Sequence, residues 1–485
     1  MLDIGKRLRI VLGALALAFA ALAATLQAAP EVYVASAGDH STGAGWSTAF
    51  TNVQAAIDAV DDGGSIHLKG ETFTITNQLT WIGGADVTLR GGYQGVGVPG
   101  PRDPRQWPTT LQLAPGYESR VLYAEGVDNG VIESIRFAGG NRRGRAVGDA
   151  GGGLCLSNNL SMTLRDCIIT NNLAEKFGGG LAIIGTASGY AGPTMIDQCV
   201  IAANRAVLPS TDYPSGGGLY AYYASTITMT DCRIVTNNVH GTGPYGGGMF
   251  LLRATVNATR TLLADNWLSG GGYFRGGAAQ VSSLARLNLD GCIVRNNRCI
   301  GGSNARGAGI CTDSSSSFYF RNTLFHGNIA SGTATYGGAI CYYTGNNLTI
   351  DNCTFADNAP TAIDRQNVNG SIELNNCILW GNGEREIIDR GDSLKTTAYH
   401  CDIRDGFNNG TNNCFARDPR FMRPAAAQYQ LRTHSPCREQ GKALSWHTAD
   451  GVDLAGNPRI LPTKGIVDLG ALEGLPLQAT WLILR

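Results

Sequence analysis

The chain has no net charge, and this absence excludes several classes of partner. Its 485 residues carry 38 lysines and arginines against 38 aspartates and glutamates. A protein without a basic surplus has no global field that would attract a polyphosphate or an anionic membrane surface. We therefore do not expect nucleic acid as a partner.

Long apolar runs are also scarce, because only the N-terminus contains one. Basic residues within positions 6–9 precede an apolar stretch from Ile10 to Leu26, and small residues follow it. This order is typical of a secretory signal, so we assign residues 1–29 to a signal peptide and expect an exported bacterial protein. The run would also suit an uncleaved membrane anchor, so the cleavage site stays open.

Metal-binding spacings are missing as well. The sequence contains no paired CxxC or HxxxH, and its histidines stand apart from one another. Zinc is therefore not expected. No cofactor is evident, and calcium stays an option that no motif indicates.

Glycine, in contrast, is abundant, with 66 residues where a share of roughly 7% is usual. The glycines have no three-residue period and prolines number only 17, which excludes collagen. Many stand in runs: GGGL at 151, 178 and 216, GGGM at 246, GGAA at 276, GAGI at 307 and GGAI at 337. Because glycine permits positive φ and close contact between stacked backbones, the runs predict one corner of a repeating unit.

A repeat of about 30 residues can be aligned on a column of cysteines, in which Thr261 and Thr323 fill two gaps. Apolar residues recur two positions after and three positions before the column, and period-two alternation predicts short strands between tight turns. We interpret the column as small buried side chains with free thiols. Cys414 and Cys437 lie outside it and are the most plausible disulfide. The column residues are Cys167, Cys199, Cys232, Cys292, Cys353, Cys377 and Cys401.

Five residues after each column position stands an asparagine. Asparagine tolerates a left-handed bend between strands, and stacked asparagines can hydrogen-bond along a stack through their side-chain amides. We therefore predict a structural ladder, with successive parallel strands about 4.8 Å apart. Its members are Asn172, Asn204, Asn237, Asn266, Asn297, Asn328, Asn358 and Asn382.

The segment before the repeats predicts an amphipathic helix that Thr51 or Asn52 can cap. A stack of repeats has an open end whose core and strand edges must be covered, and this helix is suited to cover it. Its apolar face consists of Val53, Ala56, Ile57 and Val60.

With these motifs in view, the chain resembles bacterial right-handed parallel β-helix proteins of the pectate-lyase-like superfamily. The opening YVASAGD and GGSIHLKGETF resembles their first coil and capping helix. The alternation of GGAI with TLFHGN and CTFADN resembles repeats of chlamydial polymorphic outer-membrane proteins. The tail DPRFMRP, DLAGNPRI and VDLGALE resembles a choice-of-anchor Q domain. The resemblance implies an all-β fold, namely a single-stranded right-handed parallel β-helix, or solenoid, with an N-terminal capping helix.

This interpretation gives a domain organisation for the whole chain. We expect a signal peptide at 1–29, an N-terminal cap at 30–64, a β-helix of about 11 to 13 coils at 65–414, a choice-of-anchor-Q-like module at 415–474 and a short apolar tail at 475–485. We expect a monomer that is secreted or held at the cell surface, with outer-membrane or cell-envelope association.

No catalytic residue can be assigned from the sequence. The polygalacturonase signatures are missing except for Asp61-Asp62, which lies beside the predicted capping helix, and motifs of related esterases and lyases are absent. The densest charged groups are interpreted as solvated loops or as surface and turn pairs: Arg142, Arg143, Arg145, Asp149, Glu175 and Lys176, and further on Asp364, Arg365, Arg404 and Asp405.

A binding surface has a more repetitive basis. Between 5 and 11 residues separate each ladder asparagine from the next glycine run, so one edge of the stack is expected to carry variable loops. Aromatic rings just before the glycines could stack on sugars or contact another protein, and they could equally pack on neighbouring coils. The residues of this predicted row are Phe177, Tyr213, Tyr245, Phe274 and Tyr336.

From these observations we expect an exported, non-catalytic, adhesin-like protein that binds polysaccharides or cell surfaces through this edge. The alternative is a polysaccharide lyase or glycoside hydrolase of the pectate-lyase-like superfamily with a divergent site, since a β-helix hosts many unrelated functions.

Overall fold

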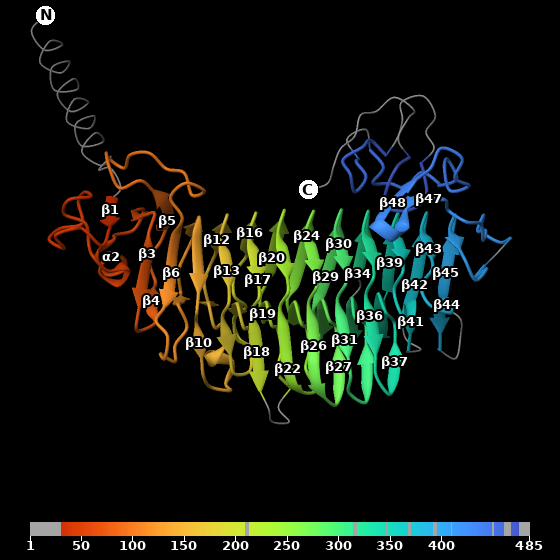
Figure 1. The fold of residues 1–485 in the computed structure, drawn as a ribbon, viewed down its shortest axis with the longest axis horizontal. Helices are drawn as coiled ribbons and strands as arrows, with labels where there is room; N and C mark the ends of the chain where they lie inside the picture. Colours follow the sequence, from red (N-terminus) through yellow and green to blue (C-terminus); the bar gives the residue numbers. More distant parts are fainter. Residues whose placement is uncertain are drawn as a thin grey trace, which may run out of the picture.

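The computed structural model describes residues 31–208, 213–313, 318–345, 347–366, 370–390, 395–408, 410–448, 451–459 and 467–474. The predicted signal peptide and apolar tail lie outside these residues. Parallel strands stack into three sheets that run along the length of the molecule (Figure 1). The predicted parallel β-helix is therefore confirmed, and the three sheets hold 13, 12 and 11 of the described strands, in agreement with 11 to 13 coils.

The first sheet is the longest, and its strands pair in parallel from coil to coil. It consists of β1 (Glu31–Val34), β2 (Ser65–Lys69), β5 (Thr88–Tyr93), β8 (Gly130–Glu133), β12 (Met162–Arg165), β16 (Thr194–Asp197), β20 (Thr226–Thr230), β24 (Thr255–Thr259), β29 (Arg286–Asp290), β34 (Phe318–Arg321), β39 (Asn347–Asp351), β42 (Ser371–Asn375) and β45 (Thr396–Tyr399).

The second sheet follows the first in each coil, and from β13 on most of its strands are three residues long. It consists of β3 (Thr72–Ile75), β6 (Thr109–Leu113), β9 (Ile135–Ala138), β13 (Ile168–Thr170), β17 (Val200–Ala202), β21 (Arg233–Val235), β25 (Leu262–Ala264), β30 (Ile293–Arg295), β35 (Leu324–His326), β40 (Thr354–Ala356), β43 (Ile378–Trp380) and β46 (Asp402–Ile403).

The third sheet follows the glycine runs. It consists of β4 (Leu79–Ile82), β7 (Leu122–Glu125), β11 (Leu154–Ser157), β15 (Leu181–Ile184), β19 (Leu219–Tyr222), β23 (Met249–Leu252), β28 (Ala279–Ser282), β33 (Ile310–Asp313), β38 (Ile340–Thr344), β41 (Thr361–Arg365) and β44 (Arg385–Asp389).

Inward side chains of the three sheets form one continuous apolar core. Ile169, Ile201 and Ile234 are register partners in the second sheet, and each is at most 1% exposed. At the N-terminal end the helix α2 (Val53–Ala59) packs on this core, and the side chain of Asn52 caps it by accepting from the backbone N–H of Ala55 at 2.8 Å. The expected capping helix is thus present, with Asn52 as its cap.

The ladder asparagines are buried and joined by hydrogen bonds along the stack. The side-chain amide of Asn266 donates to Asn297 Oδ1 at 3.0 Å and to the backbone oxygen of Ile234 at 2.9 Å. The same pair of bonds recurs from Asn172 to Asn358, and Asn382 completes the series by donating to the carboxylate of Glu386. The ladder therefore runs through eight coils and ends on a buried acceptor.

The bend beside the ladder does not fall on the asparagine itself, so that part of the prediction is wrong. The residue just before each ladder asparagine has the positive φ, for example Asn171 at 55°, Asp265 at 57° and Gly327 at 65°. The ladder residue is left in a conformation that turns its amide into the stack. The bend and the ladder are thus neighbouring positions with separate requirements.

The glycine runs form a corner as predicted. Gly178 has φ 63°, and a Cβ on Gly180 would lie 2.7 Å from the amide nitrogen of Asn204. One glycine of the run makes the turn, and another lets the backbone approach the asparagine ladder.

The column cysteines are buried in the core with free thiols, as expected. Cys167 Sγ donates to the backbone oxygen of Arg165 at 3.4 Å, and the hydroxyl of Thr261 bonds to the oxygen of Thr259 at 3.1 Å, which explains why threonine can replace cysteine. The predicted disulfide is wrong, because both of its cysteines are free. Cys437 Sγ instead donates to Asp402 at 2.9 Å, and Cys414 lies in the solenoid core.

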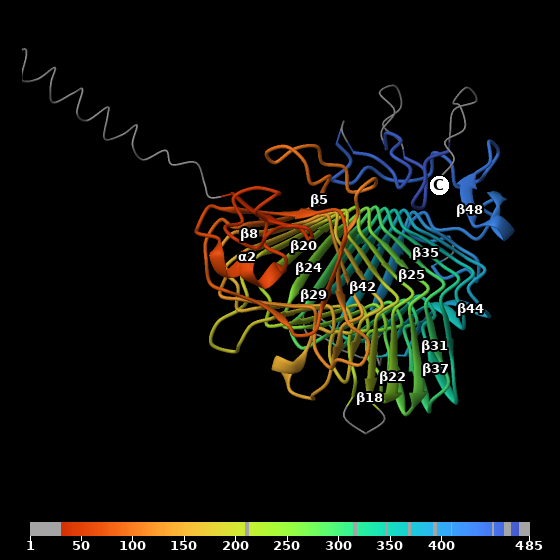
Figure 2. The ribbon, with the colours of Figure 1, turned by 60° about the vertical axis from the view of Figure 1, so that its left-hand side comes forward.

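Where the structure describes them, the insertions between the ladder and the glycine runs differ in length as expected, but they contain strands and are not merely loops. They form an ordered fin that projects below the solenoid in both views (Figures 1 and 2). Its outgoing strands are β10 (Asn141–Arg142), β14 (Leu173–Ala174), β18 (Arg205–Leu208), β22 (Asn238–Thr242), β26 (Trp267–Gly271), β31 (Arg298–Ile300) and β36 (Ile329–Ser331). Its returning strands are β27 (Tyr273–Arg275), β32 (Asn304–Arg306) and β37 (Ala334–Tyr336).

The C-terminal module lies on the opposite side of the solenoid, above it in Figures 1 and 2. Its hairpin of β47 (Phe421–Arg423) and β48 (Gln428–Leu431), joined by the 3₁₀ turn η2 (Pro424–Ala426), packs with other module residues on the outer face of the second sheet. A second 3₁₀ turn, η1 (Val147–Asp149), follows β10 near the fin. Within the described residues no helix has the length and apolarity needed to cross a membrane.

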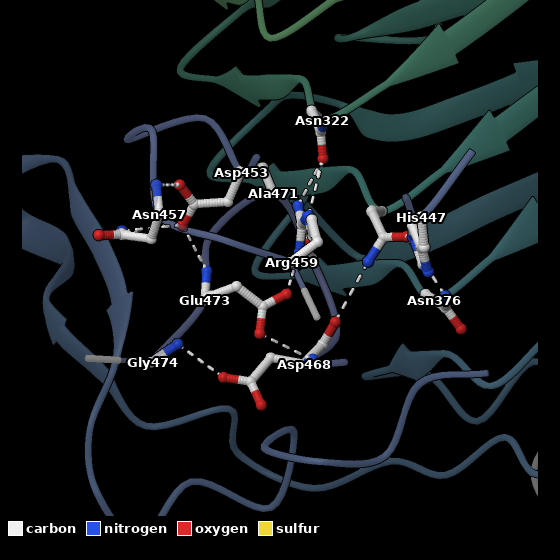
Figure 3. Close-up of polar contacts among 12 residues, drawn as sticks. Asn322, Asn376, His447, Asp453, Asn457, Arg459, Asp468, Ala471, Glu473 and Gly474 are labelled. Carbon is white, nitrogen blue, oxygen red and sulfur yellow. Dashed lines mark hydrogen bonds and ion pairs between the residues drawn. The ribbon is translucent and has the colours of Figure 1, made fainter. Parts of the chain in front are cut away.

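Polar contacts anchor the module to asparagines at the turn between the first and second sheets (Figure 3). Arg459 is fully buried, and it donates to Asn322 Oδ1 at 2.7 Å and to Glu473 Oε1 at 2.6 Å. Asn352 donates to the backbone oxygen of Asp468 at 3.2 Å, and Asn376 to that of Lys442 at 2.8 Å. Polar side chains of the C-terminal module therefore bind it to the turns of the solenoid coils.

Candidate functional site

The corner between the fin and the third sheet carries a column of side chains that differs from the predicted aromatic row. Register partners just before the glycines are, in order, Phe177, Ser215, Tyr245, Arg275, Arg306 and Tyr336. We call this set the corner column. Only three of its six members are aromatic, because a serine and two arginines occupy the other three positions.

Two predicted members of the row do not belong to the corner column. Phe274 is 0% exposed and packs inside the fin. Tyr213 is 51% exposed, and its ring stacks on that of Tyr245 with the centroids 5.5 Å apart. A shift of one residue reverses the face to which a strand side chain points, which explains Phe274 beside Arg275, whereas Tyr213 lies two residues before the column member Ser215. Spacing from the glycines alone could not separate these residues from the column.

In the N-terminal half of the corner the rings pack on one another. The Phe177 ring stacks on Tyr220 at 4.7 Å, and Tyr220 stacks on Phe250 at 5.6 Å. Tyr220 and Phe250 are register partners that point outward from the third sheet and are almost fully buried. Here the structure supports the alternative reading of the row, in which the aromatic residues pack between coils.

In the C-terminal half, guanidinium groups and tyrosine rings alternate. The guanidinium of Arg275 lies 5.4 Å from the ring centroid of Tyr245 and 5.2 Å from that of Tyr343. Arg306 lies 4.2 Å from Tyr343 on one side and 5.2 Å from Tyr336 on the other. Arg390 follows at 5.4 Å from Tyr336. We call this series of six residues, drawn from several coils, the Arg–Tyr stack.

Two of the three arginines have carboxylate partners. Arg275 pairs with Asp313 at 2.7 Å, and Arg390 binds both oxygens of Asp364, with the shorter contact at 3.0 Å. Burial raises the pKa of the Asp364 carboxyl, and the hydrogen bonds from Arg390 oppose that rise. These pairs fix the two ends of the cationic segment.

Arg306 is different, because no described residue accepts a hydrogen bond from it or lies within ion-pair distance of it, and its charge acts on Asp364 only at longer range, where it opposes the rise of that carboxyl's pKa. Its Nε and Nη1 are buried without a partner, although the side chain as a whole is only half-buried. Unpartnered polar atoms also occur close by, on Arg275 Nε, Asp313 Oδ1 and Gln280 Oε1. Buried polar groups are normally satisfied, and Arg306 has two such unpartnered nitrogens on one side chain.

The charged groups interpreted as solvated loops have mixed outcomes. Near the fin, Arg145 pairs with Glu175 at 2.9 Å, Arg143 with Glu118 at 3.4 Å and Arg142 with Asp149, and the Lys176 amine lies 4.8 Å from the Phe177 ring. These are pairs at or near the surface.

For the second charged group the prediction of surface or turn pairs is wrong for Asp364 and Arg365, whereas Asp405 is exposed and Arg404 is partly exposed. Asp364 and Arg365 are both 0% exposed, and Arg365 forms an ion pair with Asp389, which is equally buried. Arg404 pairs with the ladder-ending Glu386 at 2.8 Å. These burials could not be read from the sequence, because the partners stand on neighbouring coils.

Within the described residues no cluster of three or more His, Cys, Asp or Glu side chains is placed to hold a metal ion. The chemistry available in the corner is therefore that of guanidinium groups, tyrosine rings and two carboxylates. Guanidinium groups recognise planar anions, and aromatic faces contact sugars or further cations.

Comparison with protein-family models agrees with this architecture. A family model described as "Right handed beta helix region" matches residues 119–336, which supports the right hand of the solenoid. No curated protein matches the sequence. Among solved structures, pectate lyase Pel9A has 12% identity and a TM-score of 0.48, over 92% of this chain and 96% of its own. GH136 lacto-N-biosidase from Eubacterium ramulus has 12% identity and a TM-score of 0.36, over 80% of this chain and 68% of its own.

Proposed function

We propose that the protein binds acidic polysaccharides along the Arg–Tyr stack. The observation that carries the proposal is Arg306, a half-buried guanidinium between two tyrosine rings without an acceptor among the described residues. A carboxylate or sulfate on a sugar supplies the acceptor that this side chain lacks.

The charges of the stack favour an anionic ligand. The stack contains three arginines, and two of them are paired with carboxylates. The segment therefore has one positive charge in excess. In a partly buried setting that excess is screened less than on an open surface, and the desolvated cation makes an ion pair with a bound anion more favourable. A neutral glycan would leave the excess charge uncompensated.

The shape of the stack favours a polymer. From Tyr245 to Tyr336 the corner column crosses four successive coils, a span of roughly 14 Å at about 4.8 Å per coil. A chain that lies across the coils can contact a cation or a ring at each step, and several weak contacts then add up. The expected secreted or cell-surface location is compatible with such a ligand.

The test is binding of the mature protein to polygalacturonate and alginate, with dextran as the neutral comparison, by affinity electrophoresis and calorimetry. We expect retention by the acidic polymers that weakens with salt, and Arg306→Gln should weaken it about 10-fold. Arg298→Gln is the matched control, because Arg298 is exposed on the outgoing fin strand of the same coil and its loss removes the same charge.

Equal losses in the two variants would show that binding follows overall charge, and no binding to either acidic polymer would contradict the proposal. The same incubations are followed for unsaturated uronates by absorbance and for new reducing ends. Release of either product would replace simple binding with the lyase or hydrolase alternative.

A further inference from the structure

A second pocket lies on the opposite side of the molecule, where the C-terminal module arches over the solenoid. It has a volume of ≈ 300 Å³ and opens between the turn of the first and second sheets and the module. Its floor is Gly291, Arg260 and Arg321 stand on the solenoid side, and Trp446 and Val452 on the module side. It shares no residue with the Arg–Tyr stack.

The hollow exists because one coil has no side chain at this turn. The equivalent turn residues of three neighbouring coils are Arg260, Gly291 and Asn322. All three have positive φ, at 47°, 60° and 49°. A Cβ built on Gly291 would meet only Arg260 Cγ, at 3.8 Å, which is an ordinary contact. The glycine is therefore not required by close packing, and the space above it stays open.

The neighbouring turn shows what a side chain does in this column. The side chain of Asn322 occupies this position and is hydrogen-bonded at both ends. Its oxygen accepts from Arg459, and its amide donates to the backbone oxygen of Val452 at 2.9 Å. Asparagine is thus compatible with the turn and with the module above it. At Gly291 the equivalent space is left for something else.

The charges that line the pocket are balanced, unlike those of the Arg–Tyr stack. Arg260 holds both oxygens of Asp231, at 2.8 and 2.7 Å, and Arg321 pairs with Asp290. Each guanidinium has five N–H groups, so donors remain after these pairs are made. Asp453 also lines the pocket, and its carboxylate is occupied by backbone N–H donors of Ala455 and Glu473. The pocket therefore offers hydrogen bonds without an excess of positive charge that would select an anion.

The module side adds an apolar wall. The indole of Trp446 is fixed by donation from Nε1 to Asp351 at 3.0 Å and lies 5.3 Å from the guanidinium of Arg321. Val452 is 46% exposed although it is a large aliphatic residue. A sugar ring has a face of C–H groups and a rim of hydroxyls. The indole of Trp446 and the side chain of Val452 can contact the C–H face, and the paired guanidinium groups can donate to the hydroxyls.

We propose that this pocket binds a single neutral sugar unit, a hexose or an N-acetylhexosamine. The inference is independent of the proposed polysaccharide binding, since it concerns another face, another set of residues and a ligand of different charge. The module then both closes the outer face of the second sheet and completes a ligand site with it.

The test is saturation-transfer-difference NMR of the mature protein with a panel of neutral hexoses and N-acetylhexosamines, with glucuronate as the anionic comparison. We expect transfer to at least one neutral sugar and weaker transfer to glucuronate. Gly291→Asn places in the hollow the side chain that the same turn carries at Asn322, and it should reduce the signal at least 5-fold while the melting temperature changes little.

Two controls keep this result specific. Gln198→Asn makes the same asparagine turn in a coil outside the pocket and should leave the signal unchanged, because Gln198 is exposed and also has positive φ, at 53°. Arg306→Gln should leave it unchanged as well, whereas a loss there would place the sugar in the Arg–Tyr stack. The proposal is overturned if no neutral sugar receives saturation, or if Gly291→Asn binds like the unmodified protein.

Discussion

Arg459 and Arg306 are two half- or fully buried arginines on opposite sides of the solenoid, and their surroundings differ in one respect. Arg459 donates from all three nitrogens, to Asn322, Glu473 and the backbone oxygen of Gly470. Arg306 has rings on both sides and no described acceptor. All three nitrogens of Arg459 are therefore used in contacts within the fold, whereas Arg306 is the group that we propose for a ligand.

The difference shows how to separate structural from functional charge in a repeat protein. Module and solenoid fit each other so that donors and acceptors match, which is what a permanent contact requires. The Arg–Tyr stack leaves donors unmatched, which costs stability in the free protein and is offset when an anion binds. The predictions below test this contrast, beginning with the largest effect.

Replacing Arg459 should damage the protein most. Arg459→Met leaves the nearly buried carboxylate of Glu473 and the oxygen of Asn322 without their partner, and breaking such a pair costs about 3 to 5 kcal/mol. Urea denaturation and limited proteolysis of the C-terminal module measure the loss. Arg306→Met is the matched variant and should change stability by less than about 0.5 kcal/mol. Similar losses of stability in the two variants would contradict the distinction between a structural Arg459 and an unpaired Arg306.

The docked module should also become less stable as the pH rises. Burial raises the pKa of Glu473 from 4.5 to about 7, so the folded state favours the protonated carboxyl. Its contribution is complete below pH 4.5 and is lost as the pH rises through 7, which amounts to roughly 3 kcal/mol at about 1.36 kcal/mol per unit.

Urea midpoints between pH 5 and pH 8 measure this effect, and Glu473→Gln should flatten the part of the dependence that belongs to this group. Burial also raises the pKa of Asp468, so this group adds its own pH dependence to the module. The contribution of Glu473 is therefore the difference in pH dependence between Glu473→Gln and the unmodified protein. Glu384→Gln, at an exposed position, serves as control. A module that gains stability towards pH 8 would contradict the assignment.

The ladder is the part of the solenoid in which every amide is matched, and its disruption should have an intermediate effect. Asn266→Ala removes bonds to Ile234 and Asn297 and takes away the Oδ1 that accepts from the backbone N–H and the side-chain amide of Asn237, at a cost of about 1 to 3 kcal/mol. Thermal denaturation checks it, and Asn296→Ala, at the half-buried turn just before the ladder, is the neighbouring comparison. An unchanged melting curve for Asn266→Ala would mean that the ladder does not stabilise the stack.

Much of the scaffold could be predicted from spacing alone. The ladder asparagines recur beside the glycine runs because each coil turns at the same places. The same steric requirement at each turn therefore selects the same residue type in every coil. Glycine at Gly178 and asparagine at Asn204 are such positions, since one has positive φ and the other bonds along the stack.

The members of the Arg–Tyr stack could not be predicted from the sequence, for a physical reason. Arg275 and Arg306 interrupt the aromatic pattern, and only the register of β27, β32 and β37 shows that they continue it. Phe274 is one residue away in sequence and points into the fin. Tyr343 enters the stack from another strand and had no signal in the sequence at all.

Periodicity by itself therefore determined the solenoid, its corners and its ladder, because those features depend on contacts between equivalent residues of adjacent coils. The tertiary structure decided which charges have partners. Arg459 meets Asn322 across 137 residues of sequence, and Asp364 is buried under Arg390 from a later coil. Whether a charge is matched depends on such distant neighbours, so the free guanidinium of Arg306 and the open hollow at Gly291 could be recognised only in the folded chain.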